Sequence, residues 1–261
     1  MIRSEPHGDV TRFELTGWRS RLVGFSVSTY LVRGALIDCG YAAVRSDVAA
    51  LMAKVRPEGV VITHRHEDHA GNAELVARLG IPVLTSQATE RAIRAPGGIG
   101  LYRHWTWGAM PPLRAPLETF VPNDLRLVET PGHSDDHHVV WDEETGTLFS
   151  GDLFLGVRVR IYHPGEDPRV LVRSLRRAAA LSPDRMFDGH RGLVPTPIAA
   201  LTAKADWMDE TIAAIDGRIA EGWSDSAILR GVLGGEEWGG VFSLGDYSRA
   251  NFVRSVRKSR S

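Results

Sequence analysis

Four side chains that can bind a metal ion lie within one six-residue segment, at His64, His66, Asp68 and His69. The apolar run GVVIT at 59–63 comes directly before them and the amphipathic run NAELVARLG follows, which predicts a strand, a tight connection and a helix. Side chains at the end of a strand can point into one cavity, and imidazoles with a carboxylate suit zinc, iron or manganese. The segment therefore predicts a metal site rather than a histidine-rich surface turn.

Three later segments each place a further potential ligand directly after a predicted strand. They are Thr130-Pro131-Gly132-His133, Ser150-Gly151-Asp152 and Asp188-Gly189-His190. Together with the His-x-His-x-Asp-His pattern of the first segment, their order and spacing resemble the metallo-β-lactamase superfamily. The resemblance implies the αββα sandwich of that superfamily and a hydrolytic activity.

The resemblance also implies a ligand set for two divalent metal ions, zinc in the first place, with iron or manganese as alternatives. His64, His66 and His133 would hold one ion, Asp68, His69 and His190 the other, and Asp152 would bridge them. Two ions about 3.5–4 Å apart can share a water, lower its pKa and leave a hydroxide that attacks the substrate. We expect Asp68 also to act in catalysis, by orienting this water and relaying its proton to the leaving group.

Two residues outside this set are candidates for supporting the ligands. Metal-bound histidines usually donate their second N–H group to a carboxylate or carbonyl oxygen, and Asp38, at the end of the predicted strand ALID, is a candidate acceptor. The alternative is that Asp38 only begins the turn before Gly40. His137, four residues after His133, is expected to support the site from outside rather than to be an eighth ligand.

The rest of the chain predicts an α/β protein with a helical end. Segments rich in β-branched and aromatic residues between Phe13 and Asp38 predict a strand meander, and LRLVET, HHVVWD and GTLFSGD predict a second antiparallel block. Helical periodicity follows over 168–181, 197–220, 224–233 and 246–257. We expect a catalytic domain over residues 1–195 and a helical extension over 196–261 that packs on the same domain.

Composition restricts the partners. The 31 basic and 32 acidic residues give a net charge of −1, which disfavours nucleic acid and leaves a small molecule as the expected substrate. The first residues lack the apolar core of a signal peptide and no segment is apolar enough to span a membrane, so we expect a cytoplasmic protein without membrane contact. A homodimer stays open.

Three substrate classes are compatible with these patterns. A complete ligand set that includes the bridging Asp152 resembles the glyoxalase II, lactonase and nuclease branches more than the β-lactamases of the three-histidine type. The string Gly-His-Ser-Asp-Asp-His resembles the LACTB2-like proteins and the quinolone-signal thioesterase of pseudomonads. We favour hydrolysis of a carboxylic ester, thioester or lactone over a phosphodiesterase or ribonuclease activity, and place a non-enzymatic binding role last. Leu155 stands where lactonases of the superfamily commonly have a tyrosine, which lowers the lactonase option.

Aromatic residues in two segments are candidates for the substrate pocket. The segment 96–116 carries glycines, prolines and the residues Tyr102, Trp105 and Trp107, which predicts an ordered loop or a short helical lid. These three side chains could form an apolar wall for the substrate, pack the lid onto the core, or make a dimer contact. Tyr162 and His163 could enter the pocket from a second loop.

Overall fold

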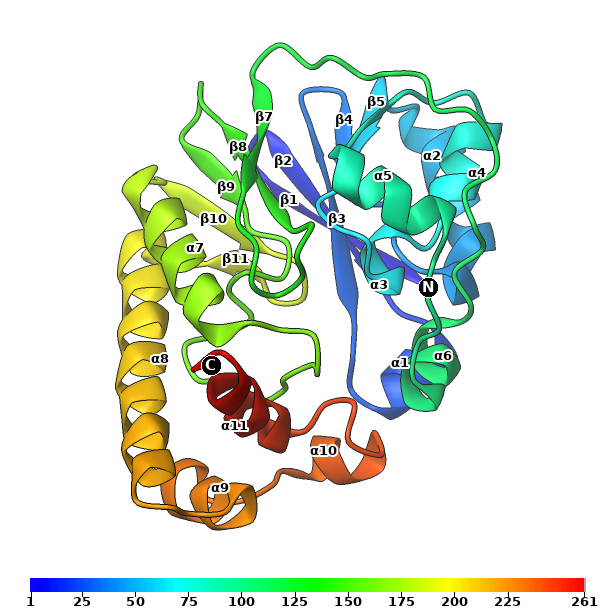
Figure 1. Ribbon diagram of the computed structural model, residues 1–261. Coiled ribbons are helices and arrows are strands. Elements are labelled where there is room, and N and C mark those ends of the chain that lie inside the picture. Colours follow the sequence, from blue (N-terminus) through cyan, green and yellow to red (C-terminus); the bar gives the residue numbers. More distant parts are fainter. Residues whose placement is uncertain (261) are drawn as a thin grey trace.

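Two β-sheets form the centre of the molecule, as Figure 1 shows for the computed structural model, which describes residues 1–260. The first sheet has the order β1-β2-β3-β4-β5-β6. Its strands are β1 (Ile2–His7), β2 (Val10–Leu15), β3 (Val27–Val32), β4 (Ala35–Ile37), β5 (Gly59–Val61) and β6 (Val83–Leu84). The strands β1 to β4 form an antiparallel meander, whereas β4, β5 and β6 run parallel.

The second sheet has the order β11-β10-β9-β8-β7. Its strands are β7 (Leu125–Glu129), β8 (His138–Asp142), β9 (Thr147–Phe149), β10 (Arg185–Asp188) and β11 (Gly192–Val194). Only β9 and β10 pair in parallel; the other neighbours are antiparallel. The strands β5, β9 and β10, which are not at the sheet edges, are short and mostly buried, as is typical of strands covered on both faces.

Helices cover the outer faces of the two sheets. On the side of the first sheet these are α1 (Trp18–Leu22), η1 (Ala42–Val44), α2 (Arg45–Val55), α3 (Glu67–Ala70), α4 (Ala73–Arg78), α5 (Gln87–Arg94) and α6 (Leu101–Trp107). The second sheet is followed by α7 (Pro168–Ala180), α8 (Pro197–Ala220), α9 (Asp225–Leu233), α10 (Trp238–Phe242) and α11 (Arg249–Lys258). Figure 1 shows α7 and α8 along the outer side of the second sheet, with α11 beside them.

Local sequence explains where the long helices begin. Asp167 precedes α7, and its carboxylate accepts hydrogen bonds from the backbone N–H groups of Arg169 and Val170, both at 3.0 Å. Pro168 occupies the first turn, where its fixed φ suits the helix and its missing N–H costs nothing. Ser224 caps α9 in a similar way through the N–H of Ala227.

The buried apolar side chains fall into three layers, which define an αββα sandwich. A central layer lies between the sheets and includes Tyr30, Val61, Val140, Phe149 and Phe187. A second layer joins the first sheet to α2, α4 and α5, and a third joins the second sheet to α7, α8, α9 and α11. The predicted fold class is therefore confirmed, including helices at the C-terminal end that share a core with the second sheet. None of the helices within residues 1–260 is long and apolar enough to cross a membrane.

Several short elements were not predicted from the sequence. The edge strand β1 has the polar sequence IRSEPH, and its extended conformation depends on pairing with β2 along its whole length. The helices α1 and α10 have five residues each, too few to show a helical period. The segment 96–116, predicted as an ordered loop or a short helical lid, does contain one short helix, α6.

Candidate metal centre

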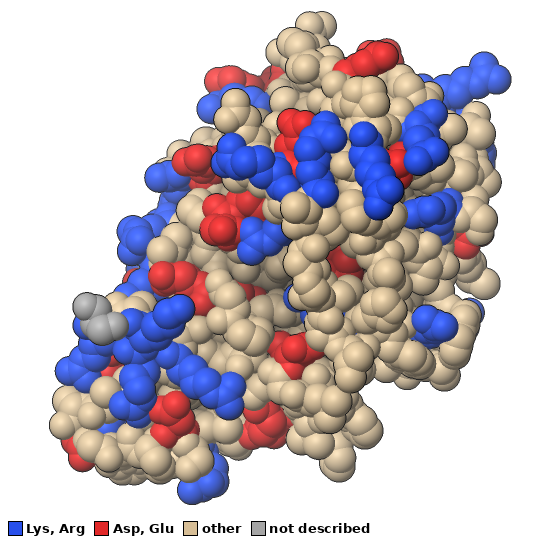
Figure 2. Space-filling view, turned by 45° about the vertical axis from the view of Figure 1, so that its right-hand side comes forward, with Lys and Arg blue, Asp and Glu red and all other residues tan. Residues whose placement is uncertain are grey.

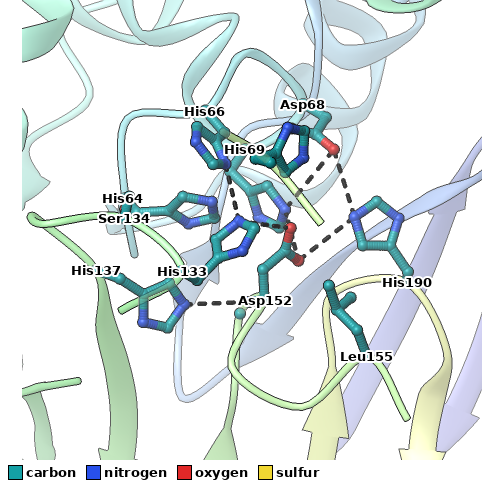
Figure 3. A network of polar contacts seen from close by, with 12 residues as sticks. His64, His66, Asp68, His69, His133, Ser134, His137, Asp152, Leu155 and His190 are labelled. Atoms are coloured by element: carbon teal, nitrogen blue, oxygen red, sulfur yellow. Dashed lines mark hydrogen bonds and ion pairs between the residues drawn. The ribbon is translucent and has the colours of Figure 1, made fainter. Parts of the chain in front are cut away.

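The predicted ligands come together where loops from both sheets meet. His64 and His66 follow β5, Asp68 and His69 lie in α3, His133 lies between β7 and β8, Asp152 follows β9, and His190 lies between β10 and β11. Figure 3 shows these side chains pointing toward one another, with the carboxylate of Asp152 between the imidazoles. A strand-to-loop junction at the carboxyl end of β5 and of β9 thus supplies most of the cluster.

Asp38 organises the first loop. Its backbone has a φ of +61°, an uncommon conformation for a residue other than glycine, and its carboxylate is buried. One carboxylate oxygen accepts the backbone N–H of Thr63 at 2.9 Å and the other lies 2.7 Å from Nδ1 of His69. The Thr63 hydroxyl donates to Asp38 and accepts from Nδ1 of His64 at 2.9 Å. Asp38 therefore contacts His69 directly and His64 through Thr63, and its support of bound metal ions stays a prediction.

Two further histidines are fixed through the same ring nitrogen. Nδ1 of His133 lies 3.2 Å from the carboxylate of Glu166, which is buried. Nδ1 of His190 donates to the backbone carbonyl of Ser26 at 2.6 Å. Because a neutral imidazole carries one N–H, these contacts assign the proton to Nδ1 and leave the lone pair of Nε2 facing the cluster.

His137 supports Asp152 rather than joining the ligands. Its Nε2 accepts the backbone N–H of Asp152 at 3.1 Å, and its Nδ1 lies 2.9 Å from the hydroxyl of Thr130. Burial, followed by the neighbouring imidazole of His133, lowers the pKa of His137 well below its ordinary value, so it is neutral as the acceptor role demands. His137 is thus outside the two groups of potential ligands, and its support of the site stays a prediction.

Glycine is required where the loops come closest. A Cβ atom on Gly189 would lie 2.8 Å from a carboxylate oxygen of Asp152 and 2.8 Å from Cε1 of His69. Gly132, directly before His133, has a φ of +128°, and a Cβ there would lie 2.4 Å from the backbone nitrogen of Leu171. A side chain at either position would push apart the segments that carry the cluster.

The clustered side chains form two groups that share Asp152. One group is His64, His66, His133 and Asp152; the other is Asp68, His69, Asp152 and His190. Within each group, one ligand-type atom from every residue lies within 4.8 Å of the others. The groups correspond to the two ligand sets that the resemblance implies, residue for residue.

Within residues 1–260, several ligand-type atoms in these groups lack hydrogen-bond donors, as expected for atoms that bind a metal ion. Nε2 of His64, Nε2 of His69 and Oδ1 of Asp152 are buried and have no hydrogen-bond partner among the described residues. Nε2 of His69 lies 3.1 Å from Oδ1 of Asp152, so two lone-pair-bearing atoms face each other once the proton of His69 is on Nδ1. Buried acceptors without a donor cost free energy, and a cation between them removes that cost.

The pKa values of three histidines are raised, which indicates that the cluster attracts positive charge. Burial opposes ionisation of His69 and His190, but the carboxylate of Asp152 raises the pKa of both well above the ordinary value. Against the same burial, Glu166 and Asp152 raise the pKa of His133 to about 9. Divalent metal ions would supply the same positive charge without a proton.

A cavity of about 510 Å³ opens onto the cluster. Its wall includes His66, Asp68, His133, Asp152 and His190, whereas His64 and His69 lie fully buried behind it. The wall is partly apolar, with contributions from Phe25, Trp107, Leu155 and Tyr247 among others. A small organic molecule of ordinary size fits such a volume.

Two of the five predicted pocket residues, Trp107 and His163, line this cavity. The structure places the other three elsewhere. Tyr162 is fully buried and its ring packs on Phe252, in the core beneath the C-terminal helices. Trp105 is 38% exposed and packs edge-on against Trp18 at the surface, and Tyr102 packs behind Tyr247 rather than in the wall.

Sequence reasoning missed many residues of the cavity wall, and four of them have polar side chains that matter for the site. They are Arg103, Glu166, Lys204 and Tyr247. Arg103 forms a two-pronged ion pair with the buried carboxylate of Glu67, which links α6 to the metal-ligand segment. Lys204 had a visible signal, since it occupies an inward position of α8 between Leu201 and Met208. No sequence pattern marked Glu166 or Tyr247, because only the folded chain brings their segments to the cavity.

A family model described as the metallo-beta-lactamase superfamily matches residues 22–190, well over half of the chain. The chain therefore belongs to the metallo-beta-lactamase superfamily. This confirms the family resemblance, whose motifs all lie inside the matched range.

Three similar proteins illustrate the relationship. The chain is 29% identical over 192 residues to the Beta-lactamase-like protein 2 homolog of Drosophila melanogaster, covering 67% of this chain and 61% of the relative. It is 35% identical over 156 residues to a Hydroxyacylglutathione hydrolase of Methylobacterium nodulans, covering 56% and 53%. The chain thus spans less than two thirds of the length of either relative. A solved metallo-beta-lactamase family protein from Thermus thermophilus shares the fold with a TM-score of 0.62 and 18% identity, covering 99% of this chain and 93% of that one.

Proposed function

We propose that this protein is a hydrolase that uses two divalent metal ions, zinc in the first place, to cleave a carboxylic ester or thioester. The observation that carries the proposal is the pair of four-residue groups that share Asp152 at the wall of one cavity. Buried nitrogen and oxygen atoms without partners point into these groups. Imidazole and carboxylate donors in this number suit zinc, with iron and manganese as alternatives.

When bound, such a pair of ions supplies Lewis acidity and lowers the pKa of water held between them. The residues of the chain then have separate tasks. Asp38, Glu166 and the Ser26 carbonyl fix the imidazoles through Nδ1, so that the cluster changes little during the reaction.

Asp68 is the proposed catalytic residue. Burial would raise its pKa, but the charges of His69 and His190 lower it, so the carboxylate is ionised. Oδ2 of Asp68 lies 3.3 Å from Nε2 of His190, and the residue is part of the cavity wall. A carboxylate in this place can orient the attacking water and pass its proton to the leaving group.

The relatives and the cavity support an ester or thioester as the substrate. The name of the Methylobacterium relative describes hydrolysis of an acyl group carried by glutathione. The apolar part of the wall, with Phe25, Trp107 and Leu155, can accommodate an acyl chain. Leu155 lacks the hydroxyl that the lactonase branch commonly has at this place, so a lactone ranks behind these substrates.

The string Gly-His-Ser-Asp-Asp-His, which resembles the LACTB2-like proteins, keeps a metal-dependent phosphodiesterase or ribonuclease as the second candidate. Binding of a long polyanion requires a continuous basic surface. On the face drawn in Figure 2, however, Lys and Arg side chains gather in separate areas at the top and at the lower left, with acidic side chains among them. We therefore rank a small substrate first.

The test is a side-by-side hydrolysis assay on protein of measured metal content. The substrates are acyl thioesters, homoserine lactones, a nitrocefin-type β-lactam and bis-p-nitrophenyl phosphate. We expect turnover of the thioesters that chelation abolishes and metal addition restores. Turnover of the phosphodiester alone would favour the second candidate, and no turnover of any substrate by fully metal-loaded protein would contradict the proposal.

A further inference from the structure

A lysine ammonium is buried in the wall of the cavity, close to Asp152. Lys204 of α8 is only 3% exposed, and its Nζ donates hydrogen bonds to the carbonyl oxygens of Leu153 and Phe154, at 3.0 and 2.5 Å. An ammonium has three N–H donors, and the third has no acceptor among residues 1–260. Burial lowers the pKa of Lys204 to about 8, so the amine is still charged at neutral pH.

Two arginines lie at the same loop, Arg191 beside it and Arg158 at its end. Nε of Arg191 donates to the carbonyl oxygen of Leu155 at 2.7 Å, and its guanidinium lies so close to Gly156 that a Cβ there would be 3.0 Å from it. The terminal nitrogens of Arg191 have no acceptor in the described part of the chain. Arg158 ends this loop, is exposed, and forms neither an ion pair nor a side-chain hydrogen bond within residues 1–260. Three cations thus lie in or beside the loop of residues 153–158.

Within residues 1–260, the carboxylates of the cavity wall form no ion pair or hydrogen bond with the side chains of these three cations. Outside the predicted metal ligands the wall has two carboxylates, Glu166 and Glu237. Glu166 contacts Nδ1 of His133, and Glu237 pairs with Arg160 and Arg249. This side of the cavity therefore offers N–H donors that no carboxylate of its wall engages.

We propose that Lys204, Arg191 and Arg158 form an anion-binding subsite, and that the substrate carries a carboxylate or phosphate on its leaving group, away from the acyl carbon. The role of this subsite in turnover rests on the proposed hydrolase function. Loop 153–158 begins directly after Asp152, so an anion held there places the neighbouring ester or thioester bond beside the metal-binding groups. Charge-assisted hydrogen bonds are strong and directional, which suits this positioning task.

The test compares three substrates with the same acetyl group. They are the acetyl thioesters of 3-mercaptopropionate, of its uncharged amide, and of a thiol of similar length that ends in phosphate. We expect the protein to prefer an anionic substrate over the amide by about 10- to 100-fold in kcat/KM, as expected for charged hydrogen bonds. The better of the two anionic substrates identifies the anion.

Variants assign the preference to the subsite. Arg158 is exposed, so Arg158→Ala should fold normally. We expect this variant to lower the preference for the anionic substrate about tenfold, through KM. Arg158→Glu should lower the preference further than Arg158→Ala does. Lys204→Met removes the deeper charge, with circular dichroism and metal content as its folding controls. Arg173→Ala, an exposed arginine of α7 outside the cavity wall, is the matched control and should behave as the wild type.

A binding measurement separates failure of the subsite from failure of the proposed function. The probe is 3-(methylthio)propionate, which cannot be hydrolysed, with its amide as control, titrated by calorimetry into wild type and Arg158→Ala. Binding of the acid alone, weakened by Arg158→Ala, supports the subsite even if no thioester is cleaved. The anion-binding subsite would be contradicted if the anionic substrates and the amide had equal kcat/KM and the acid and amide probes bound with equal affinity.

Discussion

At the scale of single residues, the cluster depends on which nitrogen of each imidazole is free. Asp38 and Glu166 hold Nδ1 of His69 and His133, and both are buried. The free Nε2 atoms then point at Asp152, and a metal ion could be held between these atoms. Loss of one donor atom is thus expected to reduce metal affinity and activity together, with little effect on the fold.

The first prediction concerns His66, which lines the cavity within one of the two groups. His66→Ala should lower the bound metal and abolish hydrolysis, since it removes one donor of the group. Elemental analysis and the thioester assay measure both. His104→Ala, an exposed histidine of α6, serves as the control. Unchanged metal content together with unchanged turnover would refute the ligand assignment.

The second prediction concerns Asp68. Asp68→Asn keeps the size of the side chain and one oxygen, so part of the metal should remain, but the amide cannot take a proton from water. We expect a loss of about 10²- to 10⁴-fold in kcat, in the range of general base contributions. Full activity in a folded, metal-loaded Asp68→Asn protein would remove Asp68 from the mechanism.

At the scale of elements, one carboxylate connects α4 to the segment that follows α6. Glu74 accepts the backbone N–H groups of Arg114 and Ala115 at 2.8 and 3.1 Å, and its other oxygen lies 2.6 Å from Nε of Arg78. These backbone bonds, ahead of the arginine, lower the pKa of Glu74 from 4.5 to about 2. They hold the chain on either side of α6, which carries the cavity residues Arg103 and Trp107.

The third prediction gives this contact a pH dependence. Because the pKa of Glu74 is lower in the folded than in the unfolded protein, its stabilisation is complete above about pH 5 and disappears as the pH falls toward 2. Glu74→Gln should lower the free energy of unfolding by about 1–2 kcal/mol at pH 7, and the difference from wild type should shrink below pH 4. Urea unfolding of both proteins at pH values from 7 to 3 measures this difference in the free energy of unfolding. A constant difference at all pH values would contradict the prediction, and Glu90→Gln, in an exposed pair with Arg94, is the control.

At the scale of the whole molecule, the C-terminal helices complete the core of the second sheet. Met208, Ile215 and Phe252 from α8 and α11 share one buried cluster with Trp141 and Leu148 from the sheet. The same helices deliver Lys204 and the segment of Tyr247 to the cavity. We propose that residues 196–261 belong to the folding unit of residues 1–195 and do not fold apart from it.

The fourth prediction tests this unit. A chain that ends after residue 195 should be insoluble or unfolded, because it exposes the apolar cluster of the second sheet. Phe252→Ala is a milder test of the same core in the full chain, and it should lower the free energy of unfolding by about 3–5 kcal/mol. The control Val241→Ala, at an exposed site, should change this free energy by less than about 0.5 kcal/mol. Denaturant unfolding measures both variants. A soluble, cooperatively folding chain of residues 1–195 would show two independent units.

The sequence by itself determined the family, the order of the main strands and helices, and the seven clustered residues. The ligand residues directly follow strands and occur in a fixed order along the chain. This pattern is local, so it can be recognised in the sequence without knowing which distant segments contact each other. The strand β5 and the segment His64 to His69 are an example, since periodicity and residue type suffice there.

Only the tertiary structure decided which side chains surround the substrate cavity. Tyr162 and His163 are neighbours in the chain, yet one packs on Phe252 in the core and the other lines the cavity. Lys204 reaches carbonyl oxygens about fifty positions earlier in the chain, at Leu153 and Phe154. Such contacts depend on how the second sheet and the C-terminal helices pack, and no local sequence pattern encodes that packing.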